Sequence, residues 1–171
     1  MSWLIVSFMI IGCGKNRHSY LQWPATLGGL EGFSESQRQA VLAAIVEINL
    51  KSEHTLIEAP ELKTQSTSNS GSPIFFRFTA DIPEQTKVIA GRATVDSDRC
   101  DVQISSAVID NNALLVPVIF HELGHCAGLD HNPNKGEIMY AITYSMKTYY
   151  QAAFSRFFVA FLESSGLNAP K

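Results

Sequence analysis

The chain has 171 residues, of which 46% are hydrophobic and 17% are charged, and its formal net charge is −3. This length and apolar content predict one globular domain with a single core. The slightly acidic balance provides no basic surface, which argues against nucleic acid as a partner. We expect the protein to be a monomer.

The first twelve residues predict a secretion signal. Residues 3–11 form an apolar run broken only by Ser7, and a bilayer span needs about 20 residues. The run ends in Ile10-Ile-Gly-Cys13, which resembles the lipobox of bacterial lipoproteins. We therefore expect residues 1–12 to be a signal peptide and Cys13 to be lipidated, which would be the chain's only attachment to a membrane. The alternative is a mere apolar tail.

A helix is predicted to follow the segment 13–33. Ser34 has the character of an N-cap, with Glu35 and Gln37 in the first turn. Apolar residues then recur at helical spacing up to about Lys51. These residues are Val41, Leu42, Ile45, Val46 and Ile48. They predict a helix with one buried face.

Strand-like segments come next in the chain. They cover residues 55–58, 74–78, 87–95 and 101–107. Between the first two, residues 64–73 are rich in Ser, Thr, Asn and Gly and predict a loop. Three carboxylates at 96–101 could bind calcium, but few further oxygen ligands lie nearby, so a solvated loop is favoured. These strands and the flanking helices predict an α+β fold.

Two further helices are predicted. The cap of the first is one of Asp110, Asn111 and Asn112. Pro117 is tolerated in this helix only in its first turn or as a kink. The second helix covers residues 144–162, where four aromatic residues share one stripe. These are Tyr150, Phe154, Phe157 and Phe161. The stripe predicts core packing.

Residues 121–131 read H-E-x-x-H-x-x-G-x-x-H. His121 and His125 lie one helical turn apart on the same face, so their nitrogens can share one ion. Gly128 can end the helix in the left-handed conformation and let His131 approach as a third ligand. Three protein ligands with one open position predict one catalytic zinc ion. A lone His-x-x-x-His pair is common on exposed helices, but the glycine and the third histidine favour zinc.

Met139 lies eight residues after His131, and this combination resembles the metzincin zinc peptidases, which place a methionine turn beneath the metal. Residues 128–140 are similar to the matrixins from the glycine to that turn, without a gap. Residues 21–24 are similar to the start of the matrixin catalytic domain. The resemblance implies a catalytic domain over residues 34–168, with a small twisted sheet, an active-site helix and a C-terminal helix.

The implied activity is that of a zinc-dependent endopeptidase with protein or peptide substrates. Glu122 would take a proton from the attacking water and deliver it to the leaving amine. Tyr140 and Tyr144 could donate to the developing oxyanion, although simple packing beside the pocket is favoured. We expect the substrate to extend along an edge at residues 89–92. An apolar side chain would enter a pocket beside residues 139–144.

Two cysteines remain as an even pair if Cys13 is lipidated. Cys100 opens a predicted strand and Cys126 follows a zinc ligand, so a disulfide between them would clamp the helix to the sheet. The alternative is two buried free thiols. Together with the signal, this pair predicts an extracytoplasmic protein, either membrane-anchored or secreted. A latency switch through Cys13 is disfavoured, because no Pro-Arg-Cys-Gly motif is present.

Two other functions fit the same motif. The chain could be an inactive zinc-binding surface lipoprotein that serves as a binding module, but Glu122 has no chemical use in such a protein. It could also be a zinc amidase acting on cell-wall peptides, because the same attack by water would serve.

Overall fold

The computed structural model describes residues 21–59, 71–80, 90–109, 112–141 and 151–167. Its elements, in chain order, are β1 (Ala25–Glu31), α1 (Glu35–Ser52), β2 (Ile57–Glu58), β3 (Pro73–Thr79), β4 (Gly91–Asp96), β5 (Arg99–Ser105), α2 (Ser106–Ile109), α3 (Asn112–Cys126) and α4 (Gln151–Ser165).

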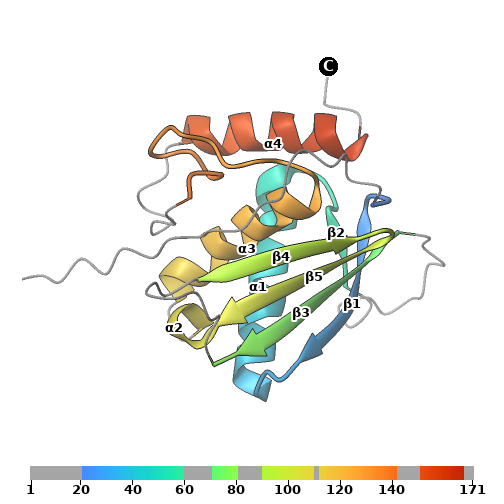
Figure 1. The fold of residues 1–171 in the computed structure, drawn as a ribbon, viewed down its shortest axis with the longest axis vertical. Helices are drawn as coiled ribbons and strands as arrows, with labels where there is room; N and C mark the ends of the chain where they lie inside the picture. The colour runs from blue at the N-terminus through green and yellow to red at the C-terminus, as the bar shows by residue number, and fades with distance from the viewer. Residues whose placement is uncertain (1–20, 60–70, 81–89, 110–111, 142–150, 168–171) are drawn as a thin grey trace, which may run out of the picture.

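The five strands form one mixed sheet in the order β2-β1-β3-β5-β4. All neighbours are parallel except β4, which runs antiparallel to β5. Figure 1 shows α1 and α3 behind the sheet and α4 across one end of it. The predicted α+β fold, with its small sheet, active-site helix and C-terminal helix, is confirmed.

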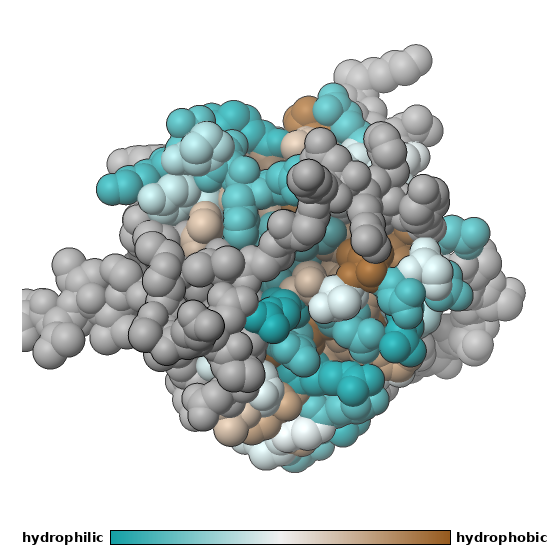
Figure 2. Space-filling view, in the orientation of Figure 1, coloured by the Kyte–Doolittle hydropathy of each residue, from teal (hydrophilic) through white to brown (hydrophobic). Residues whose placement is uncertain are grey.

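The sheet has one apolar face and one polar face. Its buried side chains, such as Phe76 and Ile104, alternate with exposed or half-buried ones along β3 and most of β5. On the polar face Arg77 lies between Glu31 and Asp101 and forms an ion pair with each. Figure 2 shows hydrophilic side chains gathered over β3 and β5 on this side. The helices therefore cover only the apolar face.

Helix α1 begins as predicted. Ser34 accepts from the backbone N–H of Gln37, and the Gln37 side chain accepts from the Ser34 N–H, which makes a complete capping box. Of the five apolar residues that recur at helical spacing, Val46 lies off the buried face, because 41% of this residue is exposed. It lies about 100° around the helix from Ile45, which is fully buried.

Strand β1 was not predicted. It lies between β2 and β3, so it is part of the sheet and not only a lead into the domain. Its register against β3 shifts between Leu27 and Gly29. A Cβ on Gly28 would lie 2.8 Å from two ring carbons of Phe75. The two adjacent glycines remove the apolar alternation by which a strand is recognised.

The other strands differ from their predictions at their ends. The predicted strand 101–107 was two residues too long, because Ser106 and Ala107 belong to α2. The Ser106 hydroxyl donates to the Ala80 carbonyl oxygen just beyond the last β3–β5 pair. Pro73 belongs to β3 and not to the predicted loop. Most of that loop, and residues 87–89 of the next predicted strand, lie outside the described residues.

Helix α4 packs its aromatic stripe against α3. The ring of Phe120 contacts three α4 rings edge-on, at centroid distances of 5.5, 5.8 and 5.6 Å. These rings are Phe154, Phe157 and Phe158. The prediction of core packing is confirmed for the described part of the stripe, and Tyr150 lies outside it. In the described part of the chain, no helix has the length and apolar character needed to cross a membrane.

Candidate metal centre

Three histidines converge at the C-terminal end of α3. The Nε2 atom of His125 lies 3.0 Å from that of His121 and 3.2 Å from that of His131. The third pair, His131 and His121, is 3.1 Å apart. Among the His, Cys, Asp and Glu side chains of the described chain, these three lie close enough together to share a metal ion.

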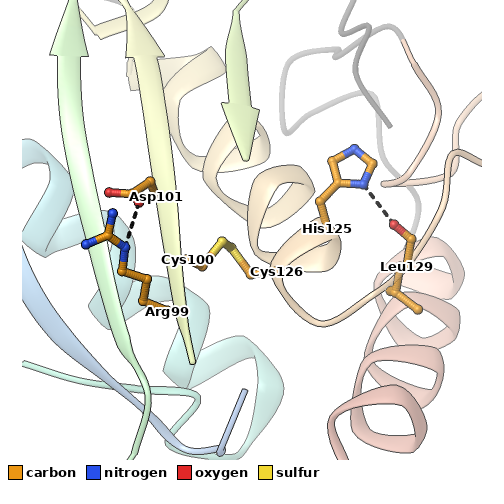
Figure 3. The surroundings of a disulfide bond; sticks show 6 residues. All are labelled: Arg99, Cys100, Asp101, His125, Cys126 and Leu129. Carbon is orange, nitrogen blue, oxygen red and sulfur yellow. Dashed lines mark hydrogen bonds and ion pairs between the residues drawn. A yellow bond between two sulfur atoms is a disulfide. The ribbon is translucent and has the colours of Figure 1, made fainter. Parts of the chain in front are cut away.

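Backbone carbonyls decide which ring nitrogens carry protons. The Nδ1 atom of His121 lies 2.8 Å from the Ile138 carbonyl oxygen, and that of His125 lies 2.8 Å from the Leu129 oxygen (Figure 3). A carbonyl oxygen can only accept, so both Nδ1 atoms donate. In a neutral ring the Nε2 atom is then unprotonated, and its lone pair faces the other two nitrogens. Three converging lone pairs repel one another unless a cation lies between them.

The residues present fit a zinc ion. A tetrahedral ion at about 2.0–2.1 Å from each nitrogen needs nitrogens about 3.3–3.4 Å apart, close to the distances observed. Burial lowers the pKa of all three histidines, in the case of His125 to about 4. They are therefore neutral at physiological pH, which is the state that binds a metal. The carbonyl partners also hold the rings in the ligating tautomer.

Glu122 is fully buried beside the three histidines. Neither carboxylate oxygen forms a hydrogen bond of ordinary geometry with a described residue, although the backbone N–H of Ala93 faces the carboxylate. Its Oε1 atom would lie only 2.8 Å from a Cβ on Gly91, the first residue of β4. Burial raises the pKa of Glu122 to about 8, and the backbone N–H of Ala93 and the charge of Arg92 offset only part of this rise. A carboxylate with such a pKa can accept a proton and give it up again near neutral pH.

The turn after α3 brings His131 to the other two histidines. Gly128 has a φ of 89°, the left-handed conformation expected for a helix end. Its N–H donates to the His125 carbonyl oxygen, and the Leu129 N–H donates to that of Gly124. The structure therefore shows that the glycine reverses the chain direction as the motif predicted.

Met139 packs on the backbone of α3 at Gly124, which lies between the first two histidines of the motif. It is 7% exposed. A Cβ on Gly124 would overlap its Sδ atom and would lie 3.0 Å from its Cε atom and from Phe157. Tyr140 is half-buried next to it. Ile142 and Tyr144, which were predicted to line the pocket, lie outside the described residues.

A disulfide joins Cys100 of β5 to Cys126, the last residue of α3. Both residues are fully buried, and Figure 3 shows the bond between strand and helix, with His125, the residue before Cys126, pointing away from it toward Leu129. The bond holds the end of the helix that carries the metal ligands against the sheet. The alternative of two free thiols is wrong for this structure.

The acidic segment 96–101 lies in the turn between β4 and β5 and at the start of β5. The Asp101 carboxylate is ion-paired with Arg77 at 3.5 Å and with Arg99 at 3.2 Å. Asp98 accepts from the Ser97 hydroxyl. Arginine contacts therefore occupy the most buried of these carboxylates.

Sequence reasoning missed three residues of the site. Gly91 provides the space that Glu122 occupies, and the carbonyl oxygens of Leu129 and Ile138 orient two ligands. A glycine in the middle of a predicted strand was a readable signal of close approach. The two carbonyls carry no signal, because every residue has one. Cys13, the predicted lipidation site, lies outside the described residues.

Comparison with known proteins agrees with this geometry. A solved structure of archaemetzincin from Methanopyrus kandleri matches 82% of this chain and 94% of its own, with a TM-score of 0.53 and 11% sequence identity. At this identity the likeness shows the fold alone, which is that of a metzincin. None of the curated proteins compared with the sequence matches it.

The family is shown by sequence. The family model described as matrixin matches residues 35–154, which is most of the chain and includes the three histidines. The chain therefore belongs to the matrixin family of zinc metalloendopeptidases.

Proposed function

We propose that this protein hydrolyses peptide bonds with one zinc ion held by His121, His125 and His131 and with Glu122 as general base and acid. The observation that carries the proposal is the convergence of three Nε2 lone pairs beside a buried carboxylate that forms no hydrogen bond of ordinary geometry in the described chain. Burying such a carboxylate costs free energy. A catalytic role accounts for its presence.

The protein's residues divide the work. When bound, zinc polarises the scissile carbonyl and lowers the pKa of a water molecule to about 7. Glu122 takes the proton of the attacking water and gives it to the leaving amine. Its burial supports both steps, because it raises the pKa of the carboxyl group toward that of zinc-bound water, and a proton moves readily between groups of similar pKa. The carbonyls of Ile138 and Leu129 keep the rings of His121 and His125 in place.

The substrate extends along β4. This strand ends the sheet at one side, and Gly91 at its start contacts Glu122. A peptide paired with the free edge of β4 would pass the buried carboxylate, and main-chain hydrogen bonds would provide most of its affinity. An apolar side chain following the cut would enter a pocket between α3 and residues 139–144, and Tyr140 would lie in the wall of that pocket.

The protein works outside the cytoplasm. The Cys100–Cys126 disulfide supports this location, because such bonds persist in oxidising compartments. We propose that residues 1–12 direct export and that a lipid on Cys13 anchors the protein to a membrane. Mass spectrometry of the protein from the membrane fraction tests this, because an unmodified Cys13 would show that the protein has no lipid anchor at this residue.

Purified protein incubated with casein and a quenched peptide library tests the proposed activity. Cleavage should stop with a chelator and return with zinc. Glu122→Ala should lower kcat/KM by about 10²–10⁴-fold and still bind zinc, because none of the three ligands is changed. Glu163→Ala, which removes an exposed glutamate from α4, is the matched control and should be fully active.

Zinc binding and cleavage are measured separately so that the alternatives can be distinguished. Wild-type protein that binds one zinc ion but cuts neither casein nor peptides would contradict the proposal and favour a binding module. Release of peptide from cell-wall fragments alone would instead indicate an amidase.

A further inference from the structure

An ion pair links the C-terminal helix to the loop beneath the metal site. The Nε atom of Arg156 on α4 donates to Oε1 of Glu137 at 2.9 Å, and Nη2 donates to the same oxygen. The Glu137 side chain is only 16% exposed, whereas that of Arg156 is 59% exposed. The arginine therefore lies over a largely buried carboxylate and neutralises it from the solvent side.

Glu137 belongs to a loop closed by its own backbone. The Asn132 N–H donates to the Met139 carbonyl oxygen at 2.7 Å and so joins the two ends of the loop. Within it, the Glu137 N–H donates to the Asn134 oxygen and the Tyr140 N–H donates to the Glu137 oxygen. A closed loop with internal turns moves as a unit, so the position of Glu137 also sets that of its neighbours.

The next residue in this loop touches a proposed metal ligand. The carbonyl oxygen of Ile138 accepts from Nδ1 of His121 at 2.8 Å, and both residues are buried. A continuous path of contacts therefore runs from Arg156 through Glu137 and Ile138 to the His121 ring. Each contact is a hydrogen bond or a peptide bond, and none depends on an apolar contact that could slide.

The ion pair is not needed to hold α4 in place. Phe157 of α4 packs on Phe120, Phe161 packs on Trp23, and the Ser164 hydroxyl donates to the Ala127 carbonyl oxygen. An ion pair whose arginine is exposed to solvent adds little to the global stability beside such burial. Arg156 therefore contributes little to the docking of α4, and its ion pair with Glu137 calls for another role.

We propose that Arg156 is a positioning residue for the metal centre, acting through Glu137 to hold the Ile138 carbonyl against His121. The inference rests on the proposed metal site but not on proteolysis. Loss of the guanidinium leaves the Glu137 carboxylate partly buried without its charge partner, and this carboxylate then moves toward water. The loop follows, and the His121 ring loses its fixed acceptor.

The test uses the purified full chain and measures zinc affinity by competition with a chromogenic chelator. Arg156→Gln should weaken zinc binding by about 3- to 10-fold, less than the 10–100-fold typical of a direct partner of a ligand. The visible absorption spectrum of the cobalt-substituted protein should change, because it reports the ligand geometry. Glu137→Gln should give the same direction of change.

Two further variants separate positioning from general structural damage. Arg156→Lys keeps the charge and should recover most of the affinity. Arg77→Gln removes an arginine of similar exposure that pairs with Glu31 and Asp101 on the opposite face of the sheet, and it should leave affinity and spectrum unchanged.

The outcomes are distinct. Unchanged zinc affinity and an unchanged cobalt spectrum in Arg156→Gln would overturn the inference, even if the melting temperature of the metal-free protein fell. Weaker binding that Arg156→Lys restores would support it. Wild-type protein that binds no metal would overturn the metal site itself, and this result is visible before any variant is made.

Discussion

The two halves of α3 are equally buried but are held in different ways. Residues 115–120 are all apolar, and their side chains pack against α1, α4 and the sheet. The half from His121 to Cys126 contains three polar residues, and His121 and Glu122 are 0% exposed while His125 is 6% exposed. Buried polar groups need partners, so this second half depends on directional contacts.

Those contacts come from outside the helix. His121 and His125 donate to loop carbonyls, and Cys126 is bonded to Cys100. Glu122 forms no hydrogen bond of ordinary geometry in the described part of the chain. The comparison teaches that one half of the helix stabilises the fold through its apolar burial. The other half lowers the stability of the fold, because it buries polar groups in order to hold them in place. Four changes test this difference.

Removing the metal should have the largest effect. Zinc present at about 1,000 times its dissociation constant should stabilise the fold by about 4 kcal/mol. Thermal unfolding with and without a chelator measures the difference. Hydrogen exchange should show faster opening in residues 121–131 than in residues 115–120. Equal acceleration in both halves would contradict the contrast drawn here.

Leu115→Ala removes a large side chain from the apolar half, where the residue is 1% exposed. The lost burial and the resulting cavity should cost about 2–5 kcal/mol of unfolding free energy. Urea titration measures this loss, and zinc affinity of the folded protein should not change. Val46→Ala, on the exposed side of α1, is the matched control and should change stability by no more than about 0.5 kcal/mol. A loss of zinc affinity in Leu115→Ala would show that the two halves are not independent.

Replacing both Cys100 and Cys126 with alanine should cost about 3 kcal/mol, because their bond closes a loop across a sequence separation of 26. Zinc binding should weaken as well, since the end of α3 is then free to move from β5. Denaturant unfolding and chelator competition measure the two effects. The wild type with a reductant should behave like the double variant. A stability loss without any change in zinc affinity would mean that the disulfide serves the fold alone.

Gly124→Ala should have the smallest effect, about 1–3 kcal/mol of stability through overpacking. The added methyl group overlaps Met139 and also approaches Phe157. Met139→Ala in the same chain makes room for it, so the double variant should lose less than the sum of the single losses. Thermal unfolding of the four proteins measures the coupling. Strict additivity would show that Met139 does not pack on this glycine.

The amino-acid sequence alone determined those features that depend on local geometry. The i, i+4 spacing of His121 and His125 needs only a helix, the Ser34 cap needs only three following residues, and Gly128 needs only its own conformational freedom. The even pair Cys100 and Cys126 was likewise readable from the chain. The resemblance of residues 128–140 to the matrixins extended this reading to the fold and to the class of reaction.

Only the tertiary structure decided what depends on distant neighbours. Strand β1 exists because β2 and β3 pair with it, although Gly28 and Gly29 hide its pattern. Glu122 is buried because β4 passes over it at Gly91, and His121 is oriented by a carbonyl 17 residues away. Burial and backbone acceptors are set by which segments meet in space. The order of the residues does not indicate which backbone carbonyl group will accept a hydrogen bond from a given side chain.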